Sequence, residues 1–116
     1  MRVAWRFDSL YQWAHHVVSS RRNNVLTDDE IRALKQTELA DLWNEVDRVV
    51  LRTIDQLCHR AKVDDDTWET LTRHLSRHQV MDLLYATGFF AMNAWAFSAM
   101  GVPLEPGYES VPDALL

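Results

Sequence analysis

The chain has 116 residues, a formal net charge of -5, 47% hydrophobic and 25% charged residues. This length suits one domain with a single hydrophobic core, and the composition excludes a disordered chain. The negative charge, without a lysine- or arginine-rich stripe, argues against non-specific nucleic-acid binding. The single cysteine, Cys58, excludes an internal disulfide and any Cys-x-x-Cys site. The N-terminus lacks a signal-peptide pattern, so we expect a cytoplasmic protein.

The first third of the chain predicts three helices. Residues 2–7 look like the last turns of one helix, and a second helix runs from about Leu10 to the Asn23–Asn24 pair. Its apolar face would carry three residues at helical spacing: Leu10, Trp13 and Val17. The sequence TDDE at residues 27–30 fits a capping box, which starts a short helix that ends near Lys35.

The middle of the chain predicts two further helices. Asn44 can cap a helix that runs to residue 62, with a core face of Val46, Val50, Ile54, Leu57 and Ala61. Its other faces would carry the charged residues Arg48, Arg52, Asp55 and Lys62. Asp64 can then cap a helix through residue 75 that turns three apolar side chains inward: Trp68, Leu71 and Leu75.

The longest predicted helix begins after its cap, Ser76, and ends near Gly101. It is apolar all round, which is typical of a helix buried in a bundle. Gly88 lies in its middle, where glycine costs about 1 kcal/mol relative to alanine. We therefore expect another helix to approach closely at this position.

The same helix raises the question of a membrane span. The segment from 80 to 102 reaches the length of about 20 residues that a bilayer requires, but Asp82 and Asn93 interrupt it and no basic cluster flanks it. We expect a helix inside a bundle and no contact with a membrane. Since no stretch alternates like a strand, the predicted class is all-α. We expect a compact array of about five to six helices over residues 1–105, followed by an extended tail at residues 106–116.

The stretch from Tyr11 to His16 is the first candidate site. Gln12 lies four residues before His16 and shares its helical face, so the two side chains can meet. An imidazole held in this way can act as a general acid or base near neutral pH. The alternative is an ordinary half-exposed helix, with one histidine in solvent and the other packed on Trp13.

Two further features have both a functional and a structural interpretation. His74 and His78 have the spacing of a zinc-binding pair, but Ser76 between them reads as a helix cap, so we expect no metal site. Cys58 lies beside His59 and near basic residues that could lower its pKa. It also fits an inward edge of its helix, where a free cysteine behaves as a small hydrophobic residue.

The order of the motifs along the chain resembles one known family. Five segments carry this resemblance, in this order: RVAWR, YQWAHHVV, NNVLTDDEI, VDRVVLRTIDQL and VDDDTWETLTRHLSRHQVMDLLYATGFFAMNAWAFSAMGVPLE. Together they resemble the carboxymuconolactone decarboxylase and alkylhydroperoxidase D-like family, in its cysteine-poor branch. The resemblance reaches nearly to Glu105. It implies an all-α fold, symmetric homo-oligomers and, since the chain begins within RVAWR, an N-terminally shortened member.

The resemblance also assigns roles to individual residues. His16 matches the family histidine, and Gln12 stands where a glutamate is usual, so it can hold a hydrogen bond but cannot relay a proton. We expect a cofactor-free enzyme of decarboxylase type, with His16 and Gln12 as catalytic residues. Tyr11 and Trp13 would shape the substrate site, and Arg6 would bind a substrate carboxylate.

Two alternatives remain open at this stage. The chain could be a non-catalytic helical protein that forms oligomers, or a relic of an enzyme, because one proton-handling residue has been replaced. It could also be a peroxidase that uses the single thiol of Cys58. A dithiol peroxidase is not expected, because the family's cysteine pair is missing.

Overall fold

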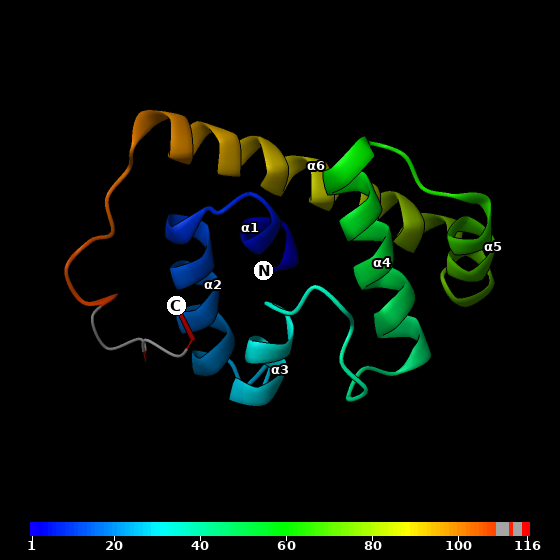
Figure 1. Cartoon of the computed structure of the whole chain (residues 1–116), viewed down its shortest axis with the longest axis horizontal. Coiled ribbons are helices and arrows are strands. Elements are labelled where there is room, and N and C mark those ends of the chain that lie inside the picture. Colours follow the sequence, from blue (N-terminus) through cyan, green and yellow to red (C-terminus); the bar gives the residue numbers. More distant parts are fainter. Residues whose placement is uncertain (109–111, 113–114) are drawn as a thin grey trace.

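The computed structural model describes residues 1–108, 112 and 115–116. Over these residues it has no strand and six helices, which confirms the all-α prediction: α1 (Arg2–Arg6), α2 (Leu10–Arg22), α3 (Asp28–Ala33), α4 (Glu45–Arg60), α5 (Asp65–His74) and α6 (Arg77–Met100). The molecule measures 44 × 30 × 24 Å. The helix α6 runs along its length, with α4 and α5 at one end and α2 towards the other (Figure 1).

The short helix α1 lies at the centre and contacts α2, α4 and α6. Its Arg2 side chain is buried and forms an ion pair with Asp55 of α4. The sequence pattern placed Asp55 outside the apolar core face of its helix, but not in contact with α1. The structure shows its carboxylate largely covered by the arginines of α1. A buried charge requires such a partner, so the ion pair fixes α1 against α4.

The helix starts follow the predicted caps. Thr27 and Glu30 form the expected capping box, in which each side chain accepts a hydrogen bond from the other residue's backbone N–H. Ser76 forms a second box with Gln79, and Asn44 caps α4 through a bond from the Asp47 amide. These local bonds explain why the positions of α3, α4 and α6 were readable from sequence.

Two groups of buried side chains form the interior. The larger group joins α1, α2 and α3 to one side of α4, and its members are Ala4, Trp13, Val17, Ile31, Ala33, Leu34, Trp43, Leu51 and Leu115. The smaller group joins α4, α5 and α6 through Val49, Leu71 and Val80. Leu115 belongs to the first group, so part of the segment predicted to be a tail packs into the core.

The helix α6 is not buried all round, which corrects the prediction from its composition. One side packs inward, and the other exposes six large apolar side chains: Met81, Tyr85, Phe89, Met92, Trp95 and Met100. A methyl group added at Gly88 would meet nothing within 4 Å, so the close helix approach expected there does not occur within the chain. No helix in the described part of the chain is long and apolar enough to cross a membrane.

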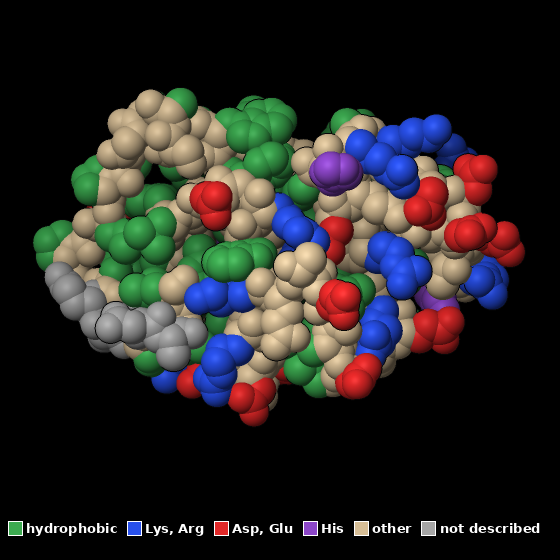
Figure 2. Space-filling model, in the orientation of Figure 1, with side chains coloured by type: hydrophobic (Ala, Val, Ile, Leu, Met, Phe, Trp, Pro, Cys, Tyr) green, Lys and Arg blue, Asp and Glu red, His purple; other side chains and the backbone are tan. Residues whose placement is uncertain are grey.

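Several other residues predicted to be buried are also exposed, among them Leu10, Val46 and Trp68. Trp13, Val17 and Leu71 are buried as predicted. In the view of Figure 2, charged side chains gather over the end of the molecule that holds α4 and α5, and hydrophobic side chains over the opposite end and along α6. The six helices therefore cover one another only in part.

Candidate functional site

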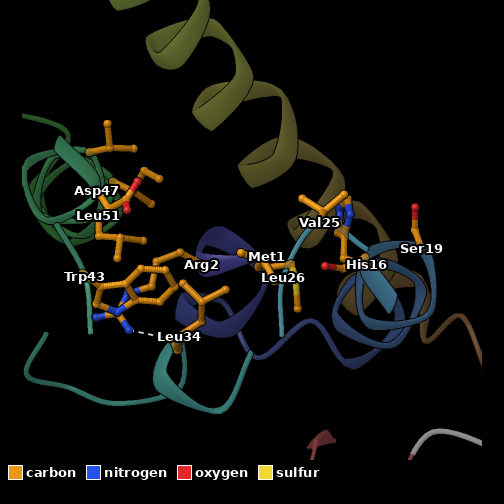
Figure 3. A pocket seen from close by; sticks show the side chains of 13 residues that line it. Met1, Arg2, His16, Ser19, Val25, Leu26, Leu34, Trp43, Asp47 and Leu51 are labelled. Atoms are coloured by element: carbon orange, nitrogen blue, oxygen red, sulfur yellow. Dashed lines mark hydrogen bonds between the residues drawn. The ribbon is translucent and has the colours of Figure 1, made fainter. Parts of the chain in front are cut away.

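A cavity of about 380 Å³ lies between α2 and α4. His16 and Ser19 line it from α2, and Asp47 and Leu51 line it from α4 on the opposite side (Figure 3). Further apolar side chains complete the lining: Met1, Val25, Leu26, Leu34, Val50 and Ile54. This volume is within the range of pockets that hold small organic molecules.

Helical spacing explains the wall that α4 contributes. Asp47, Val50, Leu51 and Ile54 recur at intervals of three and four residues, so they lie on one side of the helix. Val50 and Ile54 were predicted to belong to the core face. They are instead only partly buried, because the nearest helix across this face is separated from them by the cavity.

His16 is half-buried at the other wall, where its ring meets Phe90 edge-on at a centroid distance of 5.0 Å. Burial is the main cause that lowers the pKa of His16 to about 4, and the N-terminal amino group and then His15 lower it further. The imidazole is therefore neutral at pH 7. In this form it offers one hydrogen-bond donor and one acceptor.

The charges near the cavity do not favour an anion. The Asp47 carboxylate faces it from α4. The guanidinium of Arg2 also borders it, but its nitrogens donate to Asp55 and to the carbonyl oxygens of Leu34 and Gln36. This geometry suits an uncharged molecule with an apolar body better than a carboxylate.

Two buried polar atoms beside the cavity have no hydrogen-bond partner among the described residues: Ser20 Oγ and the indole Nε1 of Trp43. Both are sealed from solvent, so a bound molecule would reach them only if the side chains around them moved. Sequence analysis missed both residues. A buried indole N–H normally has a hydrogen-bond partner, so an unpartnered one can mark a binding site. The sequence around Trp43 did not indicate that this residue is buried, so it could not be recognised in this way.

Gln12, the expected companion of His16, lies elsewhere. Its Nε2 donates to the backbone oxygen of Phe90 at 3.1 Å, and it does not line the cavity. Its Oε1 is buried without a partner in the described part of the chain. Gln12 thus joins α2 to α6, and no hydrogen bond joins it to His16 within the structure described.

Tyr11 points away from the cavity, towards the segment that follows α6. Its hydroxyl donates to Glu105 at 2.6 Å, and its ring stacks on His15 at 4.2 Å. Nε2 of His15 in turn lies 3.3 Å from Oε2 of Glu105, and its ring packs at a tilt against the ring of Tyr108. The bond from Tyr11 is the main cause that lowers the pKa of Glu105. These contacts hold the segment after α6 against α2.

Trp13 and Arg6 are also separated from His16. Trp13 is buried in the core, where its indole N–H donates to the backbone oxygen of Leu115. Arg6 donates to Asp55 at 2.6 Å and borders a different cavity of about 440 Å³. Of the five residues proposed from the sequence, only His16 lines the cavity between α2 and α4.

Cys58 borders the Arg6 cavity and is partly buried. Its pKa is raised to about 11, first by burial and then by the Asp55 carboxylate, and these effects outweigh the nearby arginines. The basic neighbours, which the sequence suggested could lower this pKa, therefore do not lower it overall, and the structural interpretation of Cys58 is the better supported of the two. The thiol stays protonated at neutral pH, whereas thiol chemistry requires the thiolate.

His74 pairs with Glu45, at 3.3 Å, and the described residues contain no group of three or more side chains suited to a metal ion. Comparison with known proteins adds no relative: no family model, curated protein or solved structure matches the chain. The candidate site therefore depends on the cavity and its lining residues alone.

Proposed function

We propose that the protein binds a small, uncharged and mainly apolar molecule in the cavity between α2 and α4, as a carboxymuconolactone decarboxylase-like protein. One observation carries this proposal: the neutral, half-buried His16 faces an apolar cavity large enough for such a molecule. The imidazole would hydrogen-bond the bound molecule and accept or return a proton. We propose that this occurs in the cytoplasm, where an unpaired cysteine is usual.

Proton transfer is supported better than decarboxylation. A decarboxylase needs a site for the substrate carboxylate, and Arg6, the expected cation, is bonded to Asp55 on another part of the surface. A histidine with a pKa near 4 is a weak base, so His16 would take up a proton only transiently, from a group of the bound molecule to which it is hydrogen-bonded. A lyase reaction at this site would therefore require a substrate whose carboxylate is held by a residue other than Arg6.

Histidine NMR tests the binding site. Coumarin, an uncharged aromatic lactone, should produce saturable shifts of the His16 imidazole resonances, which the His16→Gln variant identifies by their loss. Coumarin-3-carboxylate should bind at least about tenfold more weakly, because Asp47 repels its charge.

A matched pair of variants locates the binding. Val50→Trp fills the cavity and should abolish the coumarin shifts, whereas Val46→Trp, one turn earlier on α4 and outside the cavity lining, should leave them intact. Equal responses in both variants, or no saturable shift in the unmodified protein, would contradict the proposed site.

A second candidate function is self-association without catalysis. It is favoured by the exposed side of α6, which carries more large apolar side chains than a monomer normally leaves in water. Sedimentation equilibrium of the unmodified protein tests it, with a monomer at every micromolar concentration as the contrary result.

A further inference from the structure

The exposed side of α6, here called the α6 face, consists of Met81, Tyr85, Phe89, Met92, Trp95 and Met100. Each of these side chains is between 43% and 73% exposed. If a large side chain has about 200 Å² of surface, the α6 face exposes roughly 700 Å². A stable protein–protein interface buries about 600–1,000 Å² on each partner, so the area of the α6 face lies within the range of such interfaces.

The spacing of residues on this side of α6 fits a helix as the partner. Six exposed positions follow one another at alternating steps of four and three residues: Met81, Tyr85, Gly88, Met92, Trp95 and Ala99. This is the repeat by which two helices interlock side by side. The repeat extends over most of the 24 residues of α6.

We propose that the α6 face binds the α6 face of a second copy of this chain, with the two helices antiparallel about a two-fold axis midway between Gly88 and Met92. This inference rests on the second candidate function, self-association, and specifies its surface and register. A two-fold axis brings the same surface of both copies together, so the face must complement itself.

The antiparallel register provides that complementarity. The six residues of the four-and-three repeat form the seam between the two helices, and each faces a counterpart across the axis. Met92 of the second copy lies over Gly88, and Trp95 of the second copy lies beside Tyr85. Ala99 gives room for Met81 in the same way. A parallel pair would set Gly88 against Gly88 and leave a void in the middle of the seam, which close packing disfavours.

The space beside Gly88 supports this register. A cavity of about 420 Å³ opens there, between α6 and the C-terminal end of α4. From α6 it is lined by Leu84, Thr87, Gly88, Ala91 and Trp95, and from the other side by Phe7 and residues 57–61. A side chain from the second copy can enter it over Gly88, where a methyl group would have no neighbour within 4 Å. The close approach of another helix that the sequence predicted at Gly88 would thus involve α6 of the second copy, not a helix of the same chain.

The charges at the ends of α6 favour the same orientation. Arg77 lies in its first turn, where its charge opposes the positive end of the helix dipole, and its last turn has no basic residue. In the antiparallel pair, Arg77 of one copy lies near the C-terminal end of the other α6. Each helix then receives a cation that its own last turn lacks.

Sedimentation equilibrium of the full chain measures the association. Met92→Lys places an ammonium group over Gly88 of the other copy, within the apolar contact close to the axis. It should raise the dissociation constant at least about a hundredfold, since burying an unpaired charge in an apolar contact is costly. Leu42→Lys is the matched control, because Leu42 is similarly exposed (49% against 54%) but lies outside α6, and it should leave the constant unchanged. Circular dichroism should show equal helix content in both variants.

Spin labels measure the register. With Cys58→Ser removing the native thiol, a nitroxide at Met81→Cys should lie about 27 Å or more from its counterpart in an antiparallel pair, the length of helix from Met81 to Ala99. A parallel pair would instead bring the two labels close enough for strong dipolar broadening.

The outcomes separate the proposals. A monomer at all micromolar concentrations would overturn both self-association and this interface. An oligomer insensitive to Met92→Lys would overturn the α6 face but leave self-association standing. Sensitivity to Met92→Lys with closely spaced labels would overturn only the antiparallel register.

Discussion

The guanidinium of Arg2 and the carboxylate of Asp55 form a two-pronged ion pair, with Nε donating to Oδ1 and Nη2 donating to Oδ2, each at 2.7 Å. Nη1 of Arg2 donates to the backbone oxygens of Leu34, at 2.6 Å, and Gln36, at 2.7 Å, just after the end of α3. One buried side chain therefore fixes α1 against α4 and closes the end of α3. Burial alone would raise the pKa of Asp55, but the bonds from Arg2 and Arg6 outweigh it and lower this pKa.

Removing the carboxylate should destabilise the fold strongly. Asp55→Ala leaves the guanidinium of Arg2 buried without its counter-charge, and the loss of one partner from a buried pair costs about 3 kcal/mol or more. Urea denaturation followed by circular dichroism measures the change in the free energy of unfolding. Asp41→Ala is the control, because Asp41 pairs with Arg48 in full contact with solvent and should contribute nothing measurable. Equal stability of the two variants would contradict the structural role of Asp55.

Acid should destabilise the protein through His16. Its pKa is about 4 in the folded protein and about 6.5 when unfolded, so the unfolded chain binds this proton more readily. Stability should therefore fall as the pH decreases from about 6.5 to about 4. His16→Gln removes this contribution, so the variant should gain stability relative to the unmodified protein over this pH range. Urea midpoints at several pH values provide the measurement, and a difference independent of pH would contradict the burial of His16.

Cys58 should be unreactive in the folded protein. With its pKa raised to about 11, against an ordinary value near 8.5, the thiolate fraction at pH 7 falls by about a hundredfold or more. Iodoacetamide should modify Cys58 slowly in buffer and at the normal rate in urea, as followed by intact mass. Hydrogen peroxide should likewise leave the folded chain's mass unchanged. Rapid formation of sulfenic acid would instead support the single-cysteine peroxidase that this pKa disfavours.

The sequence predicted features that depend on neighbouring residues in the chain. Thr27, Asn44, Asp64 and Ser76 each cap a helix as expected, because a cap and its amide partner lie within three residues. The same local patterns established the all-α class. They also placed Gly101 at the end of α6, where it has the left-handed conformation that favours glycine.

The sequence did not predict which apolar faces are covered, because coverage depends on helices that are distant in the chain. Trp68 and Leu10 lie on patterned faces but meet no covering helix and remain exposed. The burial of Arg2 was equally hidden, since Asp55 is 53 residues away. The cavity brings His16 near residues about thirty positions later, so its lining could not be read from spacing around His16.

The last described residues should contribute to stability as part of the core. Leu115 is 1% exposed, and its backbone oxygen accepts the indole N–H of Trp13. Leu115→Ala keeps this hydrogen bond but leaves a cavity, which costs about 2–5 kcal/mol for a buried leucine. Leu10→Ala removes the same atoms from a side chain that is 53% exposed, so its effect should be much smaller. Urea denaturation compares the two variants. Similar losses in both variants would contradict the packing of Leu115 in the core. A large loss in Leu115→Ala alone would support it, because only a packed side chain leaves a cavity when it is shortened.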